Sequence, residues 1–203
     1  MPPELLIATR NPGKVSEIES LIGPLPLRLR SLAEFPLTQE VEETGSTFEE
    51  NAAIKARDYA AQTGCWTLAD DSGLEVEALG GAPGVLSARY GGAGATDAER
   101  IELLLDALAR TLDAERRARF VCVVAIADST AKLCALYTGA CEGRISHAPR
   151  GRGGFGYDPI FVPDGYDKSF GELPPEIKQS ISHRARALKA ALPFLLDRFG
   201  EQA

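Results

Sequence analysis

Two adjacent carboxylates follow a short apolar run that is typical of a β-strand. Asp70 and Asp71 come directly after residues 66–69, where a turn is expected. Neighbouring negative charges raise the pKa of each other's carboxyl group unless a cation or hydrogen-bond donors offset them. Carboxylate oxygens are ligands that Mg2+ prefers, and one carboxylate could also deprotonate an attacking water. The pair therefore predicts a magnesium site, with a solvated turn as the alternative.

A second polar segment lies between an expected strand at residues 5–8 and an expected helix. It consists of Thr9, Arg10, Asn11, Pro12, Gly13 and Lys14. A helix start offers free backbone amides and a partial positive charge, and Lys14 adds a full charge. This combination suits a triphosphate, although the glycine spacing and the Lys-Ser/Thr pair of a Walker A loop are absent. An ordinary turn with Asn11 as the N-cap is the alternative.

Lys55 is expected on or beside the buried face of a helix, because it lies seven residues after Phe48 and four before Tyr59. A lysine that points inward needs an anionic partner. Glu42 or Glu43, in the preceding turn, could supply that charge, and so could a bound phosphate. A lysine that extends its ammonium group to solvent is the alternative.

A glycine-rich segment and a later basic group form the fourth candidate site. Its residues are Gly153, Gly154, Phe155, Gly156, Tyr157, Asp158, Lys178, His183 and Arg184. The glycines let the backbone approach a ligand closely, and the two aromatic rings offer flat faces for stacking. The later residues add hydrogen-bond donors near a helix start. The alternatives are a flexible loop and, for His183, a local hydrogen bond at the helix start.

The elements that must position these residues follow an α/β order. Strands are expected at residues 5–8, 25–29, 66–69, 120–127, 133–138 and 141–146, and helices start near residues 12, 48, 97 and 182. Thr47 with Glu50, and Thr96 with Glu99, fit capping boxes. Pro193 should kink or interrupt the last helix. We therefore predict a mixed central sheet flanked by helices, with two lobes in a single domain over residues 1–203.

Composition narrows the classes of partner. The 203 residues carry a net charge of −7, so nothing draws the chain as a whole toward nucleic acid or an anionic membrane. No apolar run approaches the roughly 20 residues of a membrane span. Together with the negative net charge, this predicts a cytoplasmic protein with neither a nucleic-acid nor a membrane partner. The four cysteines lack the short spacing of zinc or redox motifs, so they are expected to be reduced core residues.

The motifs, in this order, resemble the family of non-canonical purine NTP pyrophosphatases, also called inosine/xanthosine triphosphate pyrophosphatases or the Ham1-like family. The resemblance extends from Leu6 to about Leu195. It rests on residues 9–14, 42–45, 50–56, 69–73, 79–84, 87–90, 154–159 and 182–184. Two departures are Arg10, where glycine is frequent in the family, and a second proline in Pro174-Pro175 before Lys178.

The resemblance implies an elongated α/β fold with the active-site cleft between two lobes, and a homodimer. It implies Mg2+-dependent hydrolysis of dITP, ITP and XTP to the monophosphate and pyrophosphate, which cleanses the nucleotide pool. Two rival hypotheses are a Maf-like pyrophosphatase acting on dTTP, UTP or modified pyrimidine nucleotides, and a nucleotide-binding module without turnover.

The resemblance also assigns roles to residues. Those from Thr9 to Lys14 would hold the triphosphate, and Ser72 would touch substrate. Asp71 would be the proton acceptor and a metal ligand, with Lys14 and Lys55 as further catalytic residues. Glu42 is favoured as the second metal ligand, and Glu43 is possible in its place. Base recognition would fall to Phe155, Gly156, Tyr157, Asp158, Lys178, His183 and Arg184.

Overall fold

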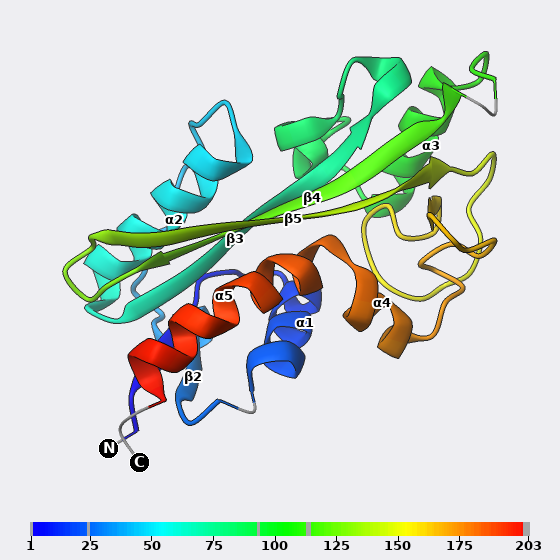
Figure 1. The fold of residues 1–203 in the computed structure, drawn as a ribbon. Coiled ribbons are helices and arrows are strands. Elements are labelled where there is room, and N and C mark those ends of the chain that lie inside the picture. The colour runs from blue at the N-terminus through cyan, green and yellow to red at the C-terminus, as the bar shows by residue number, and fades with distance from the viewer. Residues whose placement is uncertain (1, 24, 93, 113–114, 201–203) are drawn as a thin grey trace. The chain divides into compact units, whose positions relative to one another are not determined.

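The computed structural model describes residues 2–23, 25–92, 94–112 and 115–200 (Figure 1). The domain predicted for residues 1–203 also includes Met1 and residues 201–203, which lie outside the described residues. Contacts within the chain divide it into two compact units, described separately below. Unit 1 contains residues 1–71, 122–139 and 184–203, and unit 2 contains residues 72–121 and 140–183.

Strands and helices alternate in the first half of the chain. The strands are β1 (Glu4–Ile7), β2 (Arg28–Ser31), β3 (Trp66–Val76), β4 (Arg117–Ala127), β5 (Leu133–Ile145) and β6 (Phe161–Pro163). The α-helices are α1 (Pro12–Ile22), α2 (Phe48–Thr63), α3 (Asp97–Ala107), α4 (Pro175–Ile181) and α5 (His183–Phe199). Short 3-10 helices occupy Leu32–Glu34, Glu77–Leu79 and Gly84–Arg89.

The strands form one six-stranded sheet in the order β2-β1-β3-β4-β5-β6. β1 runs parallel to β2 and to β3, with Leu5 opposite Leu29 and Trp66, whereas β5 and β6 are antiparallel. The sheet therefore contains both kinds of pairing, which confirms the predicted α/β class with a mixed sheet.

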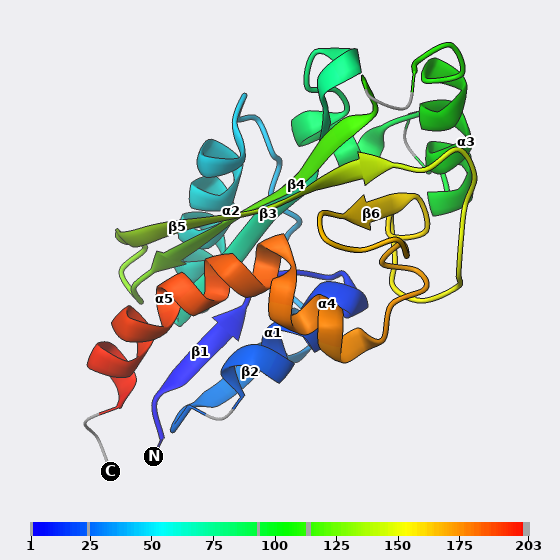
Figure 2. The ribbon, with the colours of Figure 1, turned by 45° about the vertical axis from the view of Figure 1, so that its right-hand side comes forward.

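In unit 1, helices cover both faces of the strands. α1 and α5 lie on one side of β1 and β3, and α2 lies on the other (Figure 2). The core on the α1 and α5 side includes Leu5, Ile18, Leu68, Val124 and Leu188. Because both faces are covered, β4 is buried from Cys122 onward, as its near-continuous apolar run predicts.

Unit 2 has a separate core that is rich in aromatic rings. Phe120 packs with its ring centroid 4.6 Å from that of Phe161 and 6.4 Å from that of Phe170. α3 contributes buried Ile101 and Leu104 to the same core. The capping box predicted at Thr96 is confirmed, because its side chain and that of Glu99 each accept the other's backbone N–H.

The structure corrects several boundaries. The strand predicted at residues 66–69 continues to Val76, and those predicted at 133–138 and 141–146 form the single strand β5. α5 passes through Pro193 without interruption, with that proline on its exposed side. At the start of α2, Thr47 caps the backbone as expected, but the Glu50 carboxylate accepts from Ser46.

Two composition-based predictions have simple outcomes. All four cysteines are free, as expected, but only Cys122 and Cys141 are buried, since Cys65 is partly exposed and Cys134 is exposed. Within the described ranges, no helix combines the length and apolar character that a membrane crossing requires.

Candidate active site

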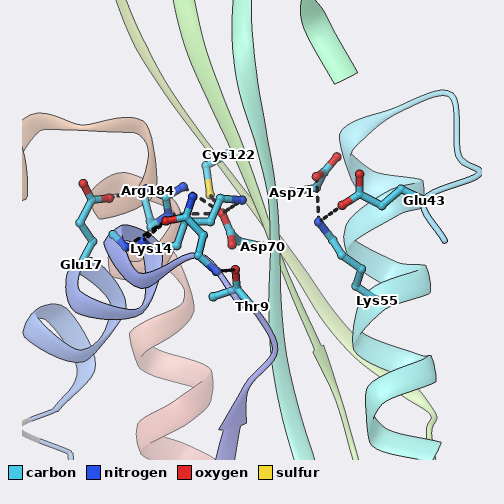
Figure 3. A network of polar contacts seen from close by, with 11 residues as sticks. Thr9, Lys14, Glu17, Glu43, Lys55, Asp70, Asp71, Cys122 and Arg184 are labelled. Atoms are coloured by element: carbon cyan, nitrogen blue, oxygen red, sulfur yellow. Dashed lines mark hydrogen bonds and ion pairs between the residues drawn. The ribbon is translucent and has the colours of Figure 1, made fainter. Parts of the chain in front are cut away.

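Strand β3 separates the two adjacent carboxylates. The prediction that they follow the end of a strand is wrong, since Asp70 and Asp71 both lie within β3. Successive side chains of a strand point to opposite faces. Asp70 therefore faces Lys14 and Arg184, and Asp71 faces Lys55 on the other side (Figure 3).

Asp70 is the centre of a buried ion-pair network. Its Oδ2 lies 3.0 Å from Lys14 Nζ and 3.0 Å from Nη2 of Arg184. Arg184 also donates to Glu17, one helical turn into α1. Burial alone would raise the pKa of the Asp70 carboxyl, but the charges of Lys14 and Arg184 outweigh it and hold that pKa far below its usual range. Asp70 is therefore a permanently ionised anchor for the lysine at the start of α1.

Asp71 belongs to a second ionic group. The Lys55 ammonium donates to Asp71 Oδ1 at 2.8 Å and to Glu43 Oε1 at 2.7 Å. The prediction that Lys55 is buried and needs an acidic partner is confirmed. Burial acts to lower the pKa of Lys55, yet the neighbouring carboxylates outweigh it and the pKa is raised. For Asp71 burial is the dominant effect, and it raises the pKa of the carboxyl despite Lys55.

The Asp71 group fits a divalent cation. Oδ2 of Asp71 is buried, and no described residue forms a hydrogen bond with it. Glu43 Oε1 and Asp71 Oδ1 accept hydrogen bonds from the same Lys55 ammonium group, so the two carboxylates lie close together. No group of three or more His, Cys, Asp or Glu residues is gathered as a metal site in the part of the chain that the structure describes. Mg2+ needs no such group, since one or two carboxylates, waters and substrate phosphates suffice.

The choice between the two glutamates changes with this geometry. Glu42 is exposed, whereas Glu43 is partly buried and shares Lys55 with Asp71. The preference for Glu42 came from the motif alone, and of the two glutamates Glu43 is the one that contacts Lys55. Glu43 is therefore the stronger candidate for the second metal ligand.

At the start of α1, Asn11 is the N-cap. Its Oδ1 accepts from the amides of Gly13 at 2.9 Å and Lys14 at 3.1 Å. The Thr9 hydroxyl accepts from the Asn11 amide at 3.2 Å. Arg10 donates to the Thr38 carbonyl at 3.1 Å. Asn11 is therefore the N-cap, as the alternative expects, and Arg10 and Lys14 are the charged donors that this segment could offer a phosphate.

In unit 2, the glycine-rich loop and α4 form a compact polar group. Asp158 Oδ2 accepts from the Phe155 amide at 2.8 Å and from Lys178 Nζ at 2.5 Å. The Lys178 ammonium lies 4.5 Å from the centroid of the Phe155 ring, within cation–π range. Only glycine fits at Gly154, because a Cβ there would lie 2.0 Å from Asp158 Oδ2. His183 stacks on Phe120 with 4.7 Å between the ring centroids.

Comparison with known proteins identifies the family to which this arrangement belongs. The sequence model of the Ham1 family matches residues 5–194. The chain belongs to the Ham1 family. Similar proteins named dITP/XTP pyrophosphatase include one from a Nostoc species, 48% identical over 93% of this chain and 92% of its own length. Another, from Deinococcus radiodurans, is 50% identical over 93% of this chain and 90% of its own length.

The fold agrees with the sequence match. The solved structure of a HAM1 protein from Coxiella burnetii superimposes with a TM-score of 0.87 at 44% identity. That match covers 96% of this chain and 99% of the other. These values place the strands and helices of this Ham1-family chain close to those of a solved relative.

Two residues assigned to base recognition have other contacts in this Ham1-family chain. The Tyr157 hydroxyl is buried and donates to the Ser87 carbonyl at 3.0 Å, and burial raises the pKa of the phenol. Arg184 is occupied by Asp70 and Glu17. Neither contact was expected from the motifs, because a motif does not say which side of its backbone a side chain takes. Ser72 follows Asp71 in β3 and is half-buried.

We expect Tyr157→Phe to leave the KM for a nucleoside triphosphate within about twofold of the parent value. The hydroxyl is directed at a backbone carbonyl, so its loss should cost about 1 kcal/mol of stability, the usual net value of such a bond. Steady-state kinetics and urea unfolding measure the two quantities. A tenfold rise in KM with unchanged stability would return Tyr157 to the base-binding residues.

Sequence reasoning gave Asn51 and Asp97 no role in the site, although both stand in motifs that it used. Asn51 is fully buried one helical turn before Lys55, and its Oδ1 accepts from the Gly45 amide at 2.8 Å. It thereby ties the turn that carries Glu43 to α2. The spacing of four residues from Lys55 was the available signal. Asp97 contacts the loop at Gly156, and no sequence signal indicates a contact across 59 residues.

Proposed function

We propose that this chain is a Mg2+-dependent pyrophosphatase that hydrolyses dITP, ITP and XTP to the monophosphate and pyrophosphate, and so cleanses the nucleotide pool. The observation that carries the proposal is the Asp71 group. A buried carboxylate with one oxygen lacking a described partner shares a lysine with a second carboxylate. Relatives named dITP/XTP pyrophosphatase, 48% and 50% identical over nearly their full length, support the substrate class.

The phosphate end of the substrate is assigned to unit 1. Lys14, at the first turn of α1, and Lys55, on α2, bring positive charge to a highly anionic tail. The α1 start adds a partial positive charge from its backbone dipoles. The ion pair with Asp70 holds Lys14 in place before substrate arrives, so little reorganisation is needed on binding.

Asp71 and Glu43 would hold the metal. When bound, Mg2+ supplies the charge that offsets the triphosphate and stabilises the pyrophosphate leaving group. Asp71 also serves as the proton acceptor for the attacking water. Asp71 suits this role because its Oδ2 is buried and no described residue forms a hydrogen bond with it.

The base end of the substrate is assigned to unit 2. The half-buried Phe155 ring offers a stacking face, and Lys178 is a donor with no acceptor capacity. Hypoxanthine and xanthine carry a 6-keto acceptor, whereas adenine carries a 6-amino donor. A site whose polar groups donate leaves adenine's amino group and its own donors unpaired, which costs binding free energy.

A substrate panel tests this proposal. We expect kcat/KM for ITP, dITP and XTP to exceed that for ATP by at least about a hundredfold, the discrimination that a missing buried hydrogen bond can supply, and to exceed that for dTTP as well. Pyrophosphate release would be measured with and without Mg2+. Equal or better turnover of dTTP would favour the Maf-like alternative, and tight binding without turnover would favour a nucleotide-binding module.

We expect Lys14→Met to raise the KM for ITP by about 10- to 100-fold, the range for a hydrogen bond between charged groups. Asp70 keeps Arg184 as a partner in this variant, so the fold should persist. Lys168→Met, which removes an exposed lysine from the loop after β6, is the matched control and should leave KM unchanged. Unaltered kinetics in Lys14→Met would remove this lysine from the phosphate site.

We also propose that the enzyme acts in the cytoplasm as a homodimer without a nucleic-acid or membrane partner. The family resemblance supports the dimer, and the net charge of −7 supports the absence of anionic partners. Light scattering of the purified chain would give the assembly mass. A monomer at micromolar concentration would contradict the dimer.

A further inference from the structure

We propose that Asp97 is a positioning residue for base recognition, because its carboxylate fixes the backbone of the loop that carries Phe155. The inference rests on the proposed function, since the loop is the one assigned to the purine base. Asp97 does not belong to the recognised motifs of the loop, and it lies 59 residues away from it in the chain.

The Asp97 carboxylate is held from two sides. It is the first residue of α3, and its Oδ2 accepts from the Gly156 amide at 2.7 Å. Its Oδ1 accepts from Nη2 of Arg100 at 2.6 Å. Arg100 in turn donates through Nη1 to the Ala88 carbonyl at 2.7 Å. The hydrogen bond to the loop is therefore anchored to α3 and to the short helix that ends at Arg89.

The loop needs such an anchor because of its composition. Phe155 lies between Gly154 and Gly156, whose φ angles are +72° and +59°. Glycine has the widest conformational freedom of any residue, so this segment loses much entropy when it is ordered. The Phe155 amide is held by Asp158 and the Gly156 amide by Asp97. Two successive backbone amides therefore donate to carboxylates, and these hydrogen bonds fix the backbone before and after the Phe155 Cα.

Packing alone does not hold this side of the loop. A cavity of about 620 Å3 is bordered there by Asp97, Ile101, Leu105, Phe155, Gly156 and Pro159. On this side of the loop, the Phe155–Gly156 peptide is held by the contact from its N–H to Asp97, while its carbonyl accepts from the Asp158 amide at 3.2 Å. We therefore expect loss of the Asp97 contact to let the Phe155 ring leave the position in which Lys178 lies over it.

A purely structural role for Asp97 is the competing explanation. A carboxylate in the first turn of a helix stabilises the helix dipole, whatever it contacts beyond the helix. The same helix start carries the Thr96–Glu99 capping box, which does not contact the loop. Glu99 is thus a matched control, since it stabilises the same turn of α3 without contacting Gly156.

The test compares Asp97→Ala, Asp97→Asn and Glu99→Gln in the full chain. We expect Asp97→Ala to raise the KM for ITP about tenfold while kcat stays within about twofold, as when binding rather than chemistry is lost. Asp97→Asn should recover part of this loss, because its amide oxygen can still accept from Gly156. Glu99→Gln should leave KM unchanged, even where it lowers the melting temperature as much as Asp97→Ala.

Amide hydrogen exchange at Gly156, measured by NMR without ligand, gives a readout independent of activity. Exchange should be faster in Asp97→Ala than in the parent and unchanged in Glu99→Gln. The proposal is overturned if Asp97→Ala keeps the parent KM, or if Glu99→Gln raises KM equally. A parent chain that releases no pyrophosphate from ITP would overturn the proposed function instead, and the exchange rates would still decide whether Asp97 holds the loop.

Discussion

Asp71→Asn is expected to lower kcat for ITP hydrolysis by about 10²- to 10⁴-fold, the usual contribution of a positioned general base. Asparagine keeps the size of the side chain but cannot accept the proton of an attacking water at neutral pH. It also removes one of the two carboxylates assigned to Mg2+. The measurement is pyrophosphate release at saturating ITP and Mg2+.

The fold of Asp71→Asn should survive, which separates a chemical from a structural effect. Burial disfavours the charge of Asp71, and Lys55 retains Glu43 as a partner. We therefore expect the free energy of unfolding to change by less than about 2 kcal/mol, as is common when an active-site charge is neutralised. Loss of activity together with unfolding would leave Asp71 without support as the proton acceptor.

Asp70→Asn, the same substitution one residue earlier, is expected to reduce the free energy of unfolding by about 3–5 kcal/mol. The Asp70 carboxylate is fully buried and offsets the charges of Lys14 and Arg184. Arg184 is itself buried, so the variant leaves it with Glu17 as its remaining anionic partner in the network. Urea unfolding of the parent and both Asp→Asn variants measures the contrast between the two neighbours.

The stability difference between the parent and Asp70→Asn should also depend on pH. The folded-state pKa of Asp70 lies far below the ordinary value of 3.8, so the stability that this residue contributes is complete above about pH 5. It is lost progressively as pH falls below that value. The difference in stability between the parent and Asp70→Asn should therefore shrink in acid. A variant as stable as the parent at neutral pH would show that Asp70 is not the anchor of the network.

Local patterns in the sequence were sufficient for several features of unit 1 and unit 2. The apolar spacing of Phe48 and Tyr59 placed Lys55 on the buried face of α2, and burial then required the acidic partner that Glu43 provides. The capping box at Thr96 located the start of α3. Such features depend on residues within a few positions of one another, where helical geometry is fixed.

Other features depend on contacts that no local pattern records. Asp70 and Asp71 resemble a turn, because strand propensity disfavours aspartate, but within β3 their charges are offset by lysine and arginine side chains from other elements. Arg184 is 114 residues from Asp70 and 167 from Glu17. Its place in the motif suggested a role in the base pocket, but its partners could be identified only from the folded chain.

The sequence also did not show that Phe155 and Tyr157 differ in their environment. Phe155 and Tyr157 are both aromatic and stand two residues apart, so both were assigned to the base. The structure leaves the Phe155 ring half-buried and beside Lys178, and it buries the Tyr157 hydroxyl against Ser87. In an extended strand, side chains two residues apart point to the same face. The backbone of this loop is not extended, because Gly154 and Gly156 have positive φ angles, so Phe155 and Tyr157 need not share a face.

Product analysis by phosphorus NMR, with ITP and Mg2+, tests the central claim most directly. For the parent chain we predict inosine monophosphate and pyrophosphate in equal amounts, and almost no product when the metal is chelated or when Asp71 is replaced by asparagine. Release of inosine diphosphate and orthophosphate, or pyrophosphate release that continues unchanged in Asp71→Asn, would contradict the account.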